Sequence, residues 1–396
     1  SAAYLRAKED YLMGINFSRL LSLKYGDTIS NYLNTRYTVI SVGRVMTCVL
    51  GMVVRREREI REFVETPFYR VLSTIGEADE SFEGEWKAVE GSRYFESFDL
   101  YKENGFKERE KAEELVSYLT DPSPVTCQIT AIEKKKEKKN PPLLFNLAEL
   151  QNECSKRFKI SPDETLRIVQ ELYEKKLVTY PRTDARVLST AVAKEIHKNL
   201  NGLMKYEPAV SYLQEIVSFG SHKGLAKTRY VNDKQITDHY AIIPTGQGIG
   251  ALKSVSSLSA KVYDVIVKRF LSIFYPAAVY QKVSITTKVK EESFFSNFKV
   301  LAEAGYLKVA NEENQSQEKS ADQKMFERVN ALKRGMMLPV SAFEIKEGKT
   351  SPPKRYNSGS LILAMENAGQ LIEDEDLRAQ IKGSGIGTSA TRGEIL

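Results

Sequence analysis

The feature that most constrains the fold of this chain is a repeated change between helical and strand-like sequence patterns. Helical periodicity over residues 2–63 gives way at Thr66-Pro67 to short β-branched and aromatic runs, and helical patterns return from residue 143. Strand-like runs resume near residue 279, and the part from residue 351 onward is helical again. This order of helix, sheet, helix, sheet and helix indicates nested domains, each interrupted by the next. We therefore expect a mixed α and β, multidomain fold.

Local signals predict the limits of several helices. The first helical pattern is expected to stop at Gly26. A helix start is marked by Ser161 as N-cap and Pro162 at the first position, with Glu164 placed to complete a capping box. This helix follows another over 143–158 after a short turn, and LVTYPRTD comes next. The order is that of a helix-turn-helix followed by an extended segment.

Composition limits the class of protein. Of the 396 residues, 42% are apolar, which is enough to give each of several domains a core. No run of about 18 uncharged apolar residues occurs, and the first residues lack the apolar centre of a signal peptide. A cytoplasmic protein with no membrane partner is therefore expected. The three cysteines are far apart and the three histidines show no ligand spacing to them, so neither disulfides nor a zinc site is expected.

The formal net charge of +6 permits a polyanionic partner without requiring one, so the positions of the basic residues matter. One basic run, KKKEKKNPP at 134–142, is interpreted either as a solvated linker or as a hinge that touches phosphate. Charged residues also recur near one face of the N-terminal helical patterns, where they are either solvated or bind a ligand. These residues are Arg6, Asp10, Arg19 and Arg44.

The stretch EKKLVTYPRTDARVLS, residues 174–189, carries a candidate nucleophile. Tyr180 precedes a proline and is expected in an extended conformation, with Arg182 two residues on pointing to the same face. A tyrosine hydroxyl, with a pKa of about 10, attacks poorly unless a cation stabilises what it attacks, and a guanidinium fork suits a phosphate. Tyr180 is thus either a nucleophile for a phosphodiester or simply one of the 20 tyrosines, placed in the core or on the surface.

Two further segments contain candidate site residues. In ITDHYAIIPT, His239 is either a structural histidine or a hydrogen-bond partner of a phosphate or an active-site acid, with Asp238 holding its tautomer. In KGSGIGTSATRGEI, residues 382–395, alternating glycines permit close backbone approach, and Thr388 or Ser389 is expected to cap a helix whose N-terminus favours phosphate. The alternative for this second segment is a glycine C-cap that runs into an N-cap.

Neither a metal site nor a nucleotide-triphosphate site is expected in this chain. Asp374 and Asp376 form a D-x-D, but acids in a first helical turn commonly complement the helix dipole, and no strand precedes these two. The glycine segment lacks the lysine of a P-loop. It also follows a helix rather than a strand, so it is not a Rossmann fingerprint.

Together and in this order, these segments resemble one family, the type IA DNA topoisomerases, and they are most similar in texture to bacterial topoisomerase III. The resemblance spans nearly the whole chain, and the tyrosine segment combined with the glycine-threonine segment is its most specific part. The similar segments are RAKEDYLMGINFSR, SVGRVMTCVLGMVVRREREI, PPLLFNLAELQ, ETLRIVQELYEKKLVTYPRTD, DHYAIIPT, RYNSGSLILAMENAG and GSGIGTSATR.

This resemblance implies a toroidal fold built from three domains around a hole for DNA. A helical base domain that grips single-stranded DNA is expected over 1–65 and 346–396, and a β-rich hinged arch over 66–140 and 277–345. A winged-helix-like, or CAP-like, domain carrying the nucleophile is expected over 141–276.

The resemblance also implies roles for individual residues. Tyr180 matches the nucleophile that takes the 5′ phosphate of a cleaved strand, and Arg182 and His239 match residues beside that phosphate. Ser389 stands where the family commonly has proline, a departure confined to the local loop. The DNA-binding residues expected in the base domain are Arg6, Asp10, Arg19, Arg44, Thr388, Thr391 and Arg392.

The family's full enzyme begins with a TOPRIM domain whose lysine, glutamate and D-x-D group bind Mg²⁺, and this chain shows no such segment. We therefore expect a fragment, inactive alone and binding no metal itself, of a monomeric magnesium-dependent enzyme. That enzyme is expected to cleave one DNA strand through a 5′-phosphotyrosine, pass a strand and religate the break without ATP. Two alternatives stay open: a non-catalytic single-stranded DNA-binding or gate module in which Tyr180 only stacks on bases, and a helix-turn-helix repressor.

Overall fold

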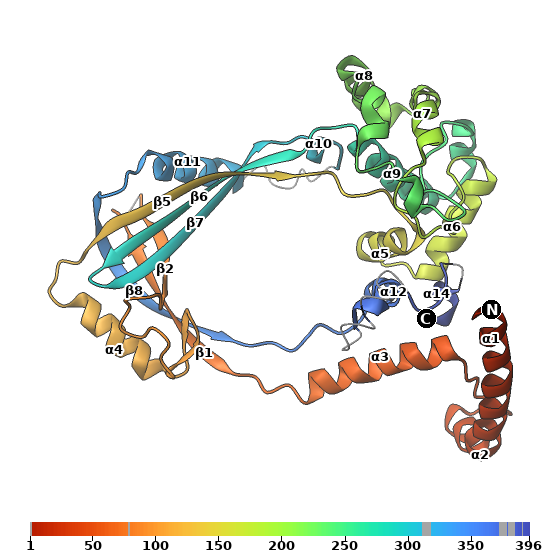
Figure 1. Ribbon diagram of the computed structural model, residues 1–396, viewed down its shortest axis with the longest axis horizontal. Helices are drawn as coiled ribbons and strands as arrows, with labels where there is room; N and C mark the ends of the chain where they lie inside the picture. Colours follow the sequence, from red (N-terminus) through yellow and green to blue (C-terminus); the bar gives the residue numbers. More distant parts are fainter. Residues whose placement is uncertain (1, 78–79, 311–317, 372–377, 379–384, 390) are drawn as a thin grey trace.

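The elements of this chain are arranged in a ring (Figure 1). A strand-rich body lies opposite a helical body, and extended segments lead from the strand-rich body along both sides of the ring. The mixed α and β, multidomain fold expected from the sequence is confirmed, while the domain limits at residues 65, 140, 276 and 345 stay predictions. The structure, a computed structural model, describes residues 2–77, 80–310, 318–371, 378, 385–389 and 391–396.

The N-terminal part is helical, and the segment between its last two helices folds back along the first of them. Its elements are α1 (Ala2–Glu9), the π-helical turn η1 (Asp10–Gly14), α2 (Ile15–Leu33) and α3 (Arg44–Arg61). The helix end predicted at Gly26 is wrong, because α2 continues until Asn34 ends it in the left-handed conformation, with φ of 54°. Gly26 instead permits close packing, since a Cβ there would lie 3.1 Å from the carbonyl oxygen of Thr38. The segment after α2 thus runs back along this helix toward α3.

The strand-rich body is a closed antiparallel barrel. The strand order β2-β7-β6-β5-β8-β1 closes on itself because β1 also pairs with β2. Buried apolar side chains, including Trp86, Phe106 and Phe294, form its core. Its elements are β1 (Pro67–Ile75), β2 (Phe82–Lys87), β3 (Leu100–Lys102), β4 (Gly105–Phe106), α4 (Arg109–Thr120), β5 (Thr126–Lys139), β6 (Ala278–Val289), β7 (Glu292–Glu303), α11 (Glu318–Ala331) and β8 (Met337–Lys349).

Most of the basic run 134–142 is strand rather than linker. Lys134 to Lys139 belong to β5 and pair residue by residue with β6. On one face of this strand, Glu137 forms ion pairs with Lys282 of β6 and with Lys299 of β7, the strand beyond it. The solvated-linker interpretation is therefore wrong for Lys134 to Lys139, which form part of the connection to the helical body.

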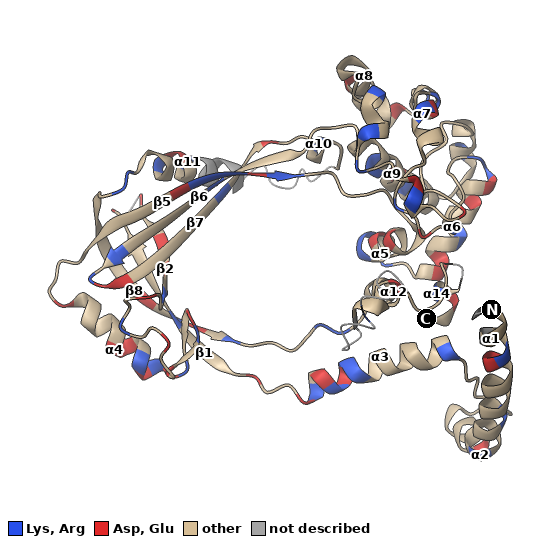
Figure 2. Ribbon diagram, viewed as in Figure 1, with Lys and Arg blue, Asp and Glu red and all other residues tan. Residues whose placement is uncertain are grey.

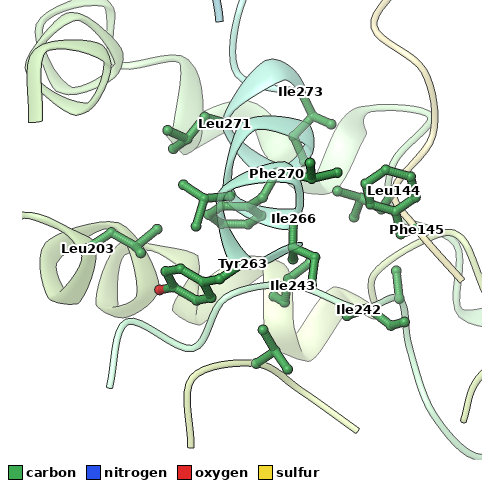
Figure 3. Packing of buried hydrophobic residues seen from close by; sticks show 14 of the residues in the cluster. Leu144, Phe145, Leu203, Ile242, Ile243, Tyr263, Ile266, Phe270, Leu271 and Ile273 are labelled. Atoms are coloured by element: carbon green, nitrogen blue, oxygen red, sulfur yellow. The ribbon is translucent and has the colours of Figure 1, made fainter. Parts of the chain in front are cut away.

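The helical body has one core, centred on the helix α9 (Figure 3). Tyr263 and Phe270 of this helix are fully buried among side chains of the surrounding helices. The helix-turn-helix order is confirmed, and Ser161 caps its second helix by accepting a hydrogen bond from Glu164 N at 3.1 Å. The capping box is half formed, because the Glu164 carboxylate pairs with Arg167 instead, at 3.9 Å. The main helices are α5 (Leu147–Phe158), α6 (Pro162–Glu174), α7 (Thr190–Leu203), α8 (Val210–Phe219) and α9 (Ser257–Ser272).

The C-terminal part closes the ring against the helical body. Its elements are α12 (Ser358–Glu366), η6 (Ala368–Leu371) and α14 (Arg392–Ile395). Helix α12 crosses α5 closely, since a Cβ on Gly359 would lie 3.0 Å from Asn152 Cα. On its other side, α12 packs on α3 through Val49, Leu361 and Met365. The helices α5, α12 and α3 therefore form a continuous layer where the ring closes.

The C-terminal helical pattern starts later than predicted, because residues 351–357 are not helical. Helix α12 begins at a capping box, in which the side chains of Asn357 and Ser360 each accept a hydrogen bond from the other's backbone N–H. Asp374 and Asp376, the D-x-D pair, lie outside the described residues. Among the described helices, none is both long and apolar enough to cross a membrane.

Candidate active site

The segment that carries Tyr180 is held extended beside the segment that carries His239. Thr179 N donates a hydrogen bond to Ile243 O at 3.0 Å, and Ile243 N donates to the Thr179 hydroxyl at 3.0 Å. Further along, the Thr183 hydroxyl donates to His239 O at 2.9 Å. Tertiary hydrogen bonds at both ends thus fix the extended conformation that is expected for a residue before proline.

Three rings meet at Tyr180. Its ring centroid lies 4.5 Å from that of His239, with the planes at 47°, and 5.4 Å from that of Tyr173, with the planes at 77°. Tyr180 is half-buried and His239 is exposed, so the site lies at the surface of the helical body rather than in its core. Tyr173, at the C-terminal end of α6, is a contact that the sequence patterns do not identify.

Arg182 places an uncompensated cation near the tyrosine. Its side chain is half-buried and makes no hydrogen bond or ion pair with any residue in the described part of the chain. The next basic residue, Arg186, is already paired with Glu149 at 2.6 Å. A guanidinium without an acidic partner favours an anionic ligand such as a phosphate.

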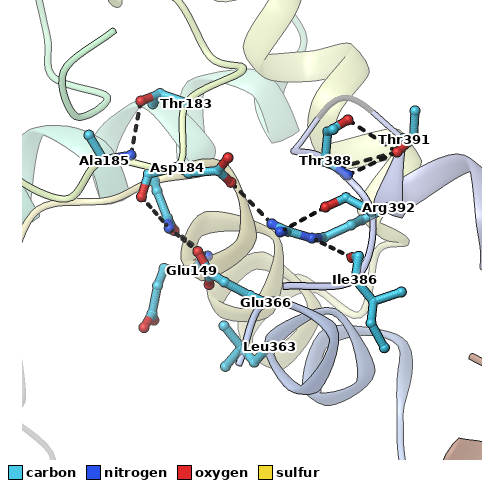
Figure 4. A network of polar contacts seen from close by, with 12 residues as sticks. Glu149, Thr183, Asp184, Ala185, Leu363, Glu366, Ile386, Thr388, Thr391 and Arg392 are labelled. Carbon is cyan, nitrogen blue, oxygen red and sulfur yellow. Dashed lines mark hydrogen bonds and ion pairs between the residues drawn. The ribbon is translucent and has the colours of Figure 1, made fainter. Parts of the chain in front are cut away.

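Arg392 joins the C-terminal segment to the tyrosine segment (Figure 4). This arginine is 5% exposed, and its Nη1 donates to Asp184 Oδ1 at 3.1 Å. It also donates to the carbonyl oxygens of Ile386 and Gly387, each at 3.1 Å. The glycine-threonine segment therefore wraps a buried guanidinium, and the carboxylate that balances its charge comes from the helical body.

A second polar link at the same junction runs from Asn146 to Glu366. The buried Asn146 side chain caps α5 by accepting from Glu149 N at 2.9 Å, and its Nδ2 donates to Glu366 Oε1 and to Asp184 O. Burial raises the pKa of Glu366, while the charge of Arg392 and the hydrogen bond from Asn146 oppose that rise. The contact between α5 and α12 is thus a polar one with its charges largely withdrawn from water.

The model of the family described as DNA topoisomerase matches residues 1–396. The chain belongs to the type IA DNA topoisomerases. Relatives named DNA topoisomerase 3 align along the whole chain: 33% identity over 404 residues in Bacillus subtilis (strain 168), 32% over 402 residues in Shouchella clausii (strain KSM-K16) and 31% over 402 residues in Bacillus licheniformis. The chain spans 50% of the length of each of these relatives.

A solved structure shows the same fold. It is the full-length topoisomerase I from Thermotoga maritima, with a TM-score of 0.59 and 23% identity, and the match covers 96% of this chain and 54% of that chain. At this identity the likeness concerns the fold alone. It confirms the toroidal, multidomain type IA core that the resemblance predicts.

Two of the predicted DNA-binding residues of this topoisomerase chain contact each other. Arg44 donates through Nε to Asp10 Oδ1 at 2.6 Å and through Nη2 to Oδ2 at 2.8 Å. This hydrogen-bonded pairing lowers the pKa of Asp10 and raises that of Arg44. Both side chains are exposed, as is that of Arg19, whereas the side chain of Arg6 lies outside the described residues.

Thr388 and Thr391 form a turn before α14. Thr388 N donates to the Thr391 hydroxyl at 3.1 Å, and Thr391 N donates back to Thr388 O at 3.0 Å. The expected side-chain cap from Thr388 or Ser389 is wrong, because Thr391 takes the N-cap position and its side chain caps no helical N–H. Both threonines are exposed, whereas Arg392 is buried in its ion pair with Asp184.

Three residues of the junction are missing from the sequence predictions: Asn146, Asp184 and Glu366. Asp184 belongs to the PRTD stretch, and Asn146 precedes a helical pattern as an N-cap residue does. Neither signal indicates that Asn146 and Asp184 each have a partner in the C-terminal part of the chain. Only the closure of the ring brings Glu366 and Arg392 to these two residues of the helical body.

Histidine, cysteine and acidic side chains of this topoisomerase do not cluster within the described residues. Among those residues there is no group of three or more histidine, cysteine, aspartate or glutamate side chains that could hold a metal ion.

Proposed function

We propose that Tyr180 is the nucleophile of a reversible DNA strand break. Its hydroxyl loses a proton, a bond forms between its oxygen and the phosphorus, and the bond from phosphorus to the 3′ oxygen breaks. The 3′ oxygen takes up a proton, and the 5′ phosphate of the strand stays joined to Tyr180. One phosphate ester replaces another of similar energy, so neither cleavage nor religation needs ATP.

The observation that carries this proposal is the placement of Tyr180 beside His239 and near an unpaired Arg182. The ring of Tyr180 is fixed by its contacts with His239 and Tyr173, so little rotational freedom is lost when a strand arrives. Arg182 has its donors free for the phosphate oxygens, where negative charge grows during attack. His239 is exposed next to the tyrosine and donates a further hydrogen bond to the phosphate in this proposal.

Strand passage in this proposal opens the ring between α5 and α12. This junction is held by polar pairs, chiefly Arg392 with Asp184 and Asn146 with Glu366. Polar pairs are replaced by water when they separate, so such a contact opens at lower cost than an apolar one. The helical body then swings away with the strand joined to Tyr180, while the extended segments from the barrel bend.

The metal ion that cleavage requires is not held by the described residues in this proposal. Magnesium, which supplies charge stabilisation during cleavage, is held in this proposal by a TOPRIM segment that this sequence does not contain, so the 396-residue chain alone is inactive. The substrate is a single DNA strand, gripped by the N-terminal and C-terminal helical parts. We infer that the protein acts as a monomer and in the cytoplasm, where bacterial DNA lies.

A second candidate function is a single-stranded DNA-binding or gate module without chemistry. The aromatic cluster of Tyr173, Tyr180 and His239 favours it, because rings at a surface stack on bases of any sequence. In that case the phenolic oxygen of Tyr180 has no role. Replacing Tyr180 by phenylalanine then leaves every property of the protein unchanged.

A cleavage assay separates the two candidates. Single-stranded DNA labelled at its 3′ end is incubated with Mg²⁺ and either this chain or a longer chain that includes a TOPRIM segment, and the mixture is then denatured. The proposal predicts that label stays with protein only for the longer chain with Tyr180 and not for its Tyr180→Phe variant. If all the proteins bind DNA and none retains label, the binding module is the correct function.

A further inference from the structure

A basic cavity lies where the barrel joins the helical body, away from the tyrosine. Its volume is about 270 Å³, and it lies between the end of β5, α5, α9 and the short helix α10 (Leu307–Ala310). Figure 2 shows the basic end of β5 leading into this junction. The charged side chains that line the cavity are Lys139, Glu153, Arg157, Lys268 and Arg269.

Arg269 is held in the cavity wall by one hydrogen bond and one ring contact. Its Nη1 donates to Leu143 O at 3.0 Å, and its Cζ lies 3.9 Å from the ring centroid of Phe145. Within the described part of the chain, no carboxylate forms an ion pair with it. Burial lowers the pKa of Arg269 to about 10, and the charges of Glu153 and Glu149 oppose this shift only in part. Most of its five N–H donors therefore have no protein acceptor.

The other cations of the cavity leave a positive excess. Lys268 pairs with Asp264 at 2.8 Å, and Arg157 pairs with Glu153. Lys139, at the end of β5, is exposed and forms no ion pair with any described residue. Two of the four cations are thus balanced and two, Lys139 and Arg269, are not. Such a cavity attracts an anion with several acceptor oxygens.

We propose that this cavity binds a phosphate group. Arg269 offers a planar fork for two phosphate oxygens, and Lys139 adds a mobile ammonium group. Because Lys139 ends β5 and α9 leads into β6, a bound phosphate touches two of the connections between the barrel and the helical body. It therefore stiffens the connection that must bend when the ring opens. The phosphate is either a small phosphate ion or part of a DNA strand, and only the second case rests on the proposed function.

Calorimetric titration with inorganic phosphate tests the cavity itself. The double variant Lys139→Gln, Arg269→Lys loses one charge and the planar fork, and we expect it to bind phosphate about tenfold more weakly or worse. Lys194→Gln is the matched control, because Lys194 is exposed on α7, lines no part of the cavity and has no ion pair with a described residue. Absence of saturable binding, or equal weakening in the control, overturns the proposal. If circular dichroism shows that the double variant is misfolded, the titration is made with the single variant Lys139→Gln.

The source of the phosphate is distinguished by a salt series. The affinity of a fluorescent single-stranded oligonucleotide is measured by anisotropy, and each lost phosphate contact reduces the logarithmic salt slope by about 0.7. A reduced slope in the double variant assigns the cavity to a DNA strand, whereas weaker phosphate binding with an unchanged slope assigns it to a small phosphate ion. Neither measurement depends on strand cleavage, so failure of the cavity and failure of the tyrosine chemistry are seen separately.

Discussion

Arg392 donates a hydrogen bond to Asp184 at 3.1 Å across the point where the ring closes. The arginine side chain is 6% exposed and the aspartate side chain 58%, so the arginine is buried while the aspartate is in contact with solvent. Asp184 follows Tyr180 closely in sequence, and Arg392 begins α14. The contact therefore couples the position of the segment that carries Tyr180 to the closed state of the ring.

Replacing Asp184 by asparagine should loosen this junction. The change keeps the shape but leaves the buried Arg392 without its counter-charge, at a cost of about 1–3 kcal/mol at the junction. We expect faster hydrogen exchange in α12 and in residues 385–396, with the barrel unchanged. Asp27→Asn, at an exposed position on α2, is the control. Equal exchange in the two variants would show that the pair does not hold the ring closed.

The junction should weaken as the pH rises. Burial raises the pKa of Glu366 above its ordinary value of 4.5, so the folded state favours the protonated form. The stability that this gives is fully present below 4.5 and is lost as the pH rises through the raised pKa of the folded state. Hydrogen exchange of α12, corrected for its intrinsic pH dependence, measures this. Glu366→Gln keeps the acceptor for Asn146 and should remove the dependence; a dependence that persists in the variant assigns it to another group.

The Thr183 hydroxyl should position His239 relative to Tyr180. It donates to His239 O at 2.9 Å and accepts from Ala185 N at 3.1 Å, and the side chain is buried. Thr183→Val leaves both backbone groups without this partner, which costs about 1–3 kcal/mol of local stability, and should slow cleavage in a longer, active chain. Thr183→Ser should restore both the melting temperature and the cleavage rate. A serine variant as slow as the valine variant would mean that the methyl group, not the hydrogen bond, matters.

Arg182→Lys should slow cleavage without abolishing DNA binding. Lysine keeps the charge but lacks the planar fork, and loss of one preorganised donor typically slows a reaction by about a hundredfold. Single-turnover cleavage of an oligonucleotide by a longer, active chain measures the rate. Arg167→Lys, at an exposed position on α6, is the matched control. If the two variants cleave at the same rate, Arg182 does not contact the phosphate.

The sequence predicts features that local chemistry determines. Pro181 restricts Tyr180 to an extended conformation, and Ser161 with Pro162 starts α6 where predicted. The alternation of helical and strand-like patterns likewise gives the correct order of the bodies. In each case the deciding interaction lies within a few residues, so it can be read from the sequence alone.

Features that depend on distant partners could not be predicted in this way. Glycine is typical of helix ends, yet Gly26 lies inside α2 and permits the close approach of the segment that contains Thr38. The lysines of β5 have a linker's composition, but pairing with β6 makes them strand. The glycine-threonine motif predicts that Arg392 binds DNA, whereas the ion pair of Arg392 with Asp184 depends on closure of the whole ring. DNA binding by Arg392 stays a prediction, and in the closed ring its partner is Asp184.

The central claim, that Tyr180 is the nucleophile, is tested most directly by mass spectrometry of the trapped DNA–protein adduct. A longer chain with a TOPRIM segment is reacted with single-stranded DNA and Mg²⁺, denatured, treated with nuclease and digested to peptides. We predict a nucleotide on Tyr180, unchanged in the Tyr173→Phe variant, whose ring lies 5.4 Å away in the intact protein. A nucleotide on Tyr173 or on any other residue, or an adduct that persists in Tyr180→Phe, would contradict the claim.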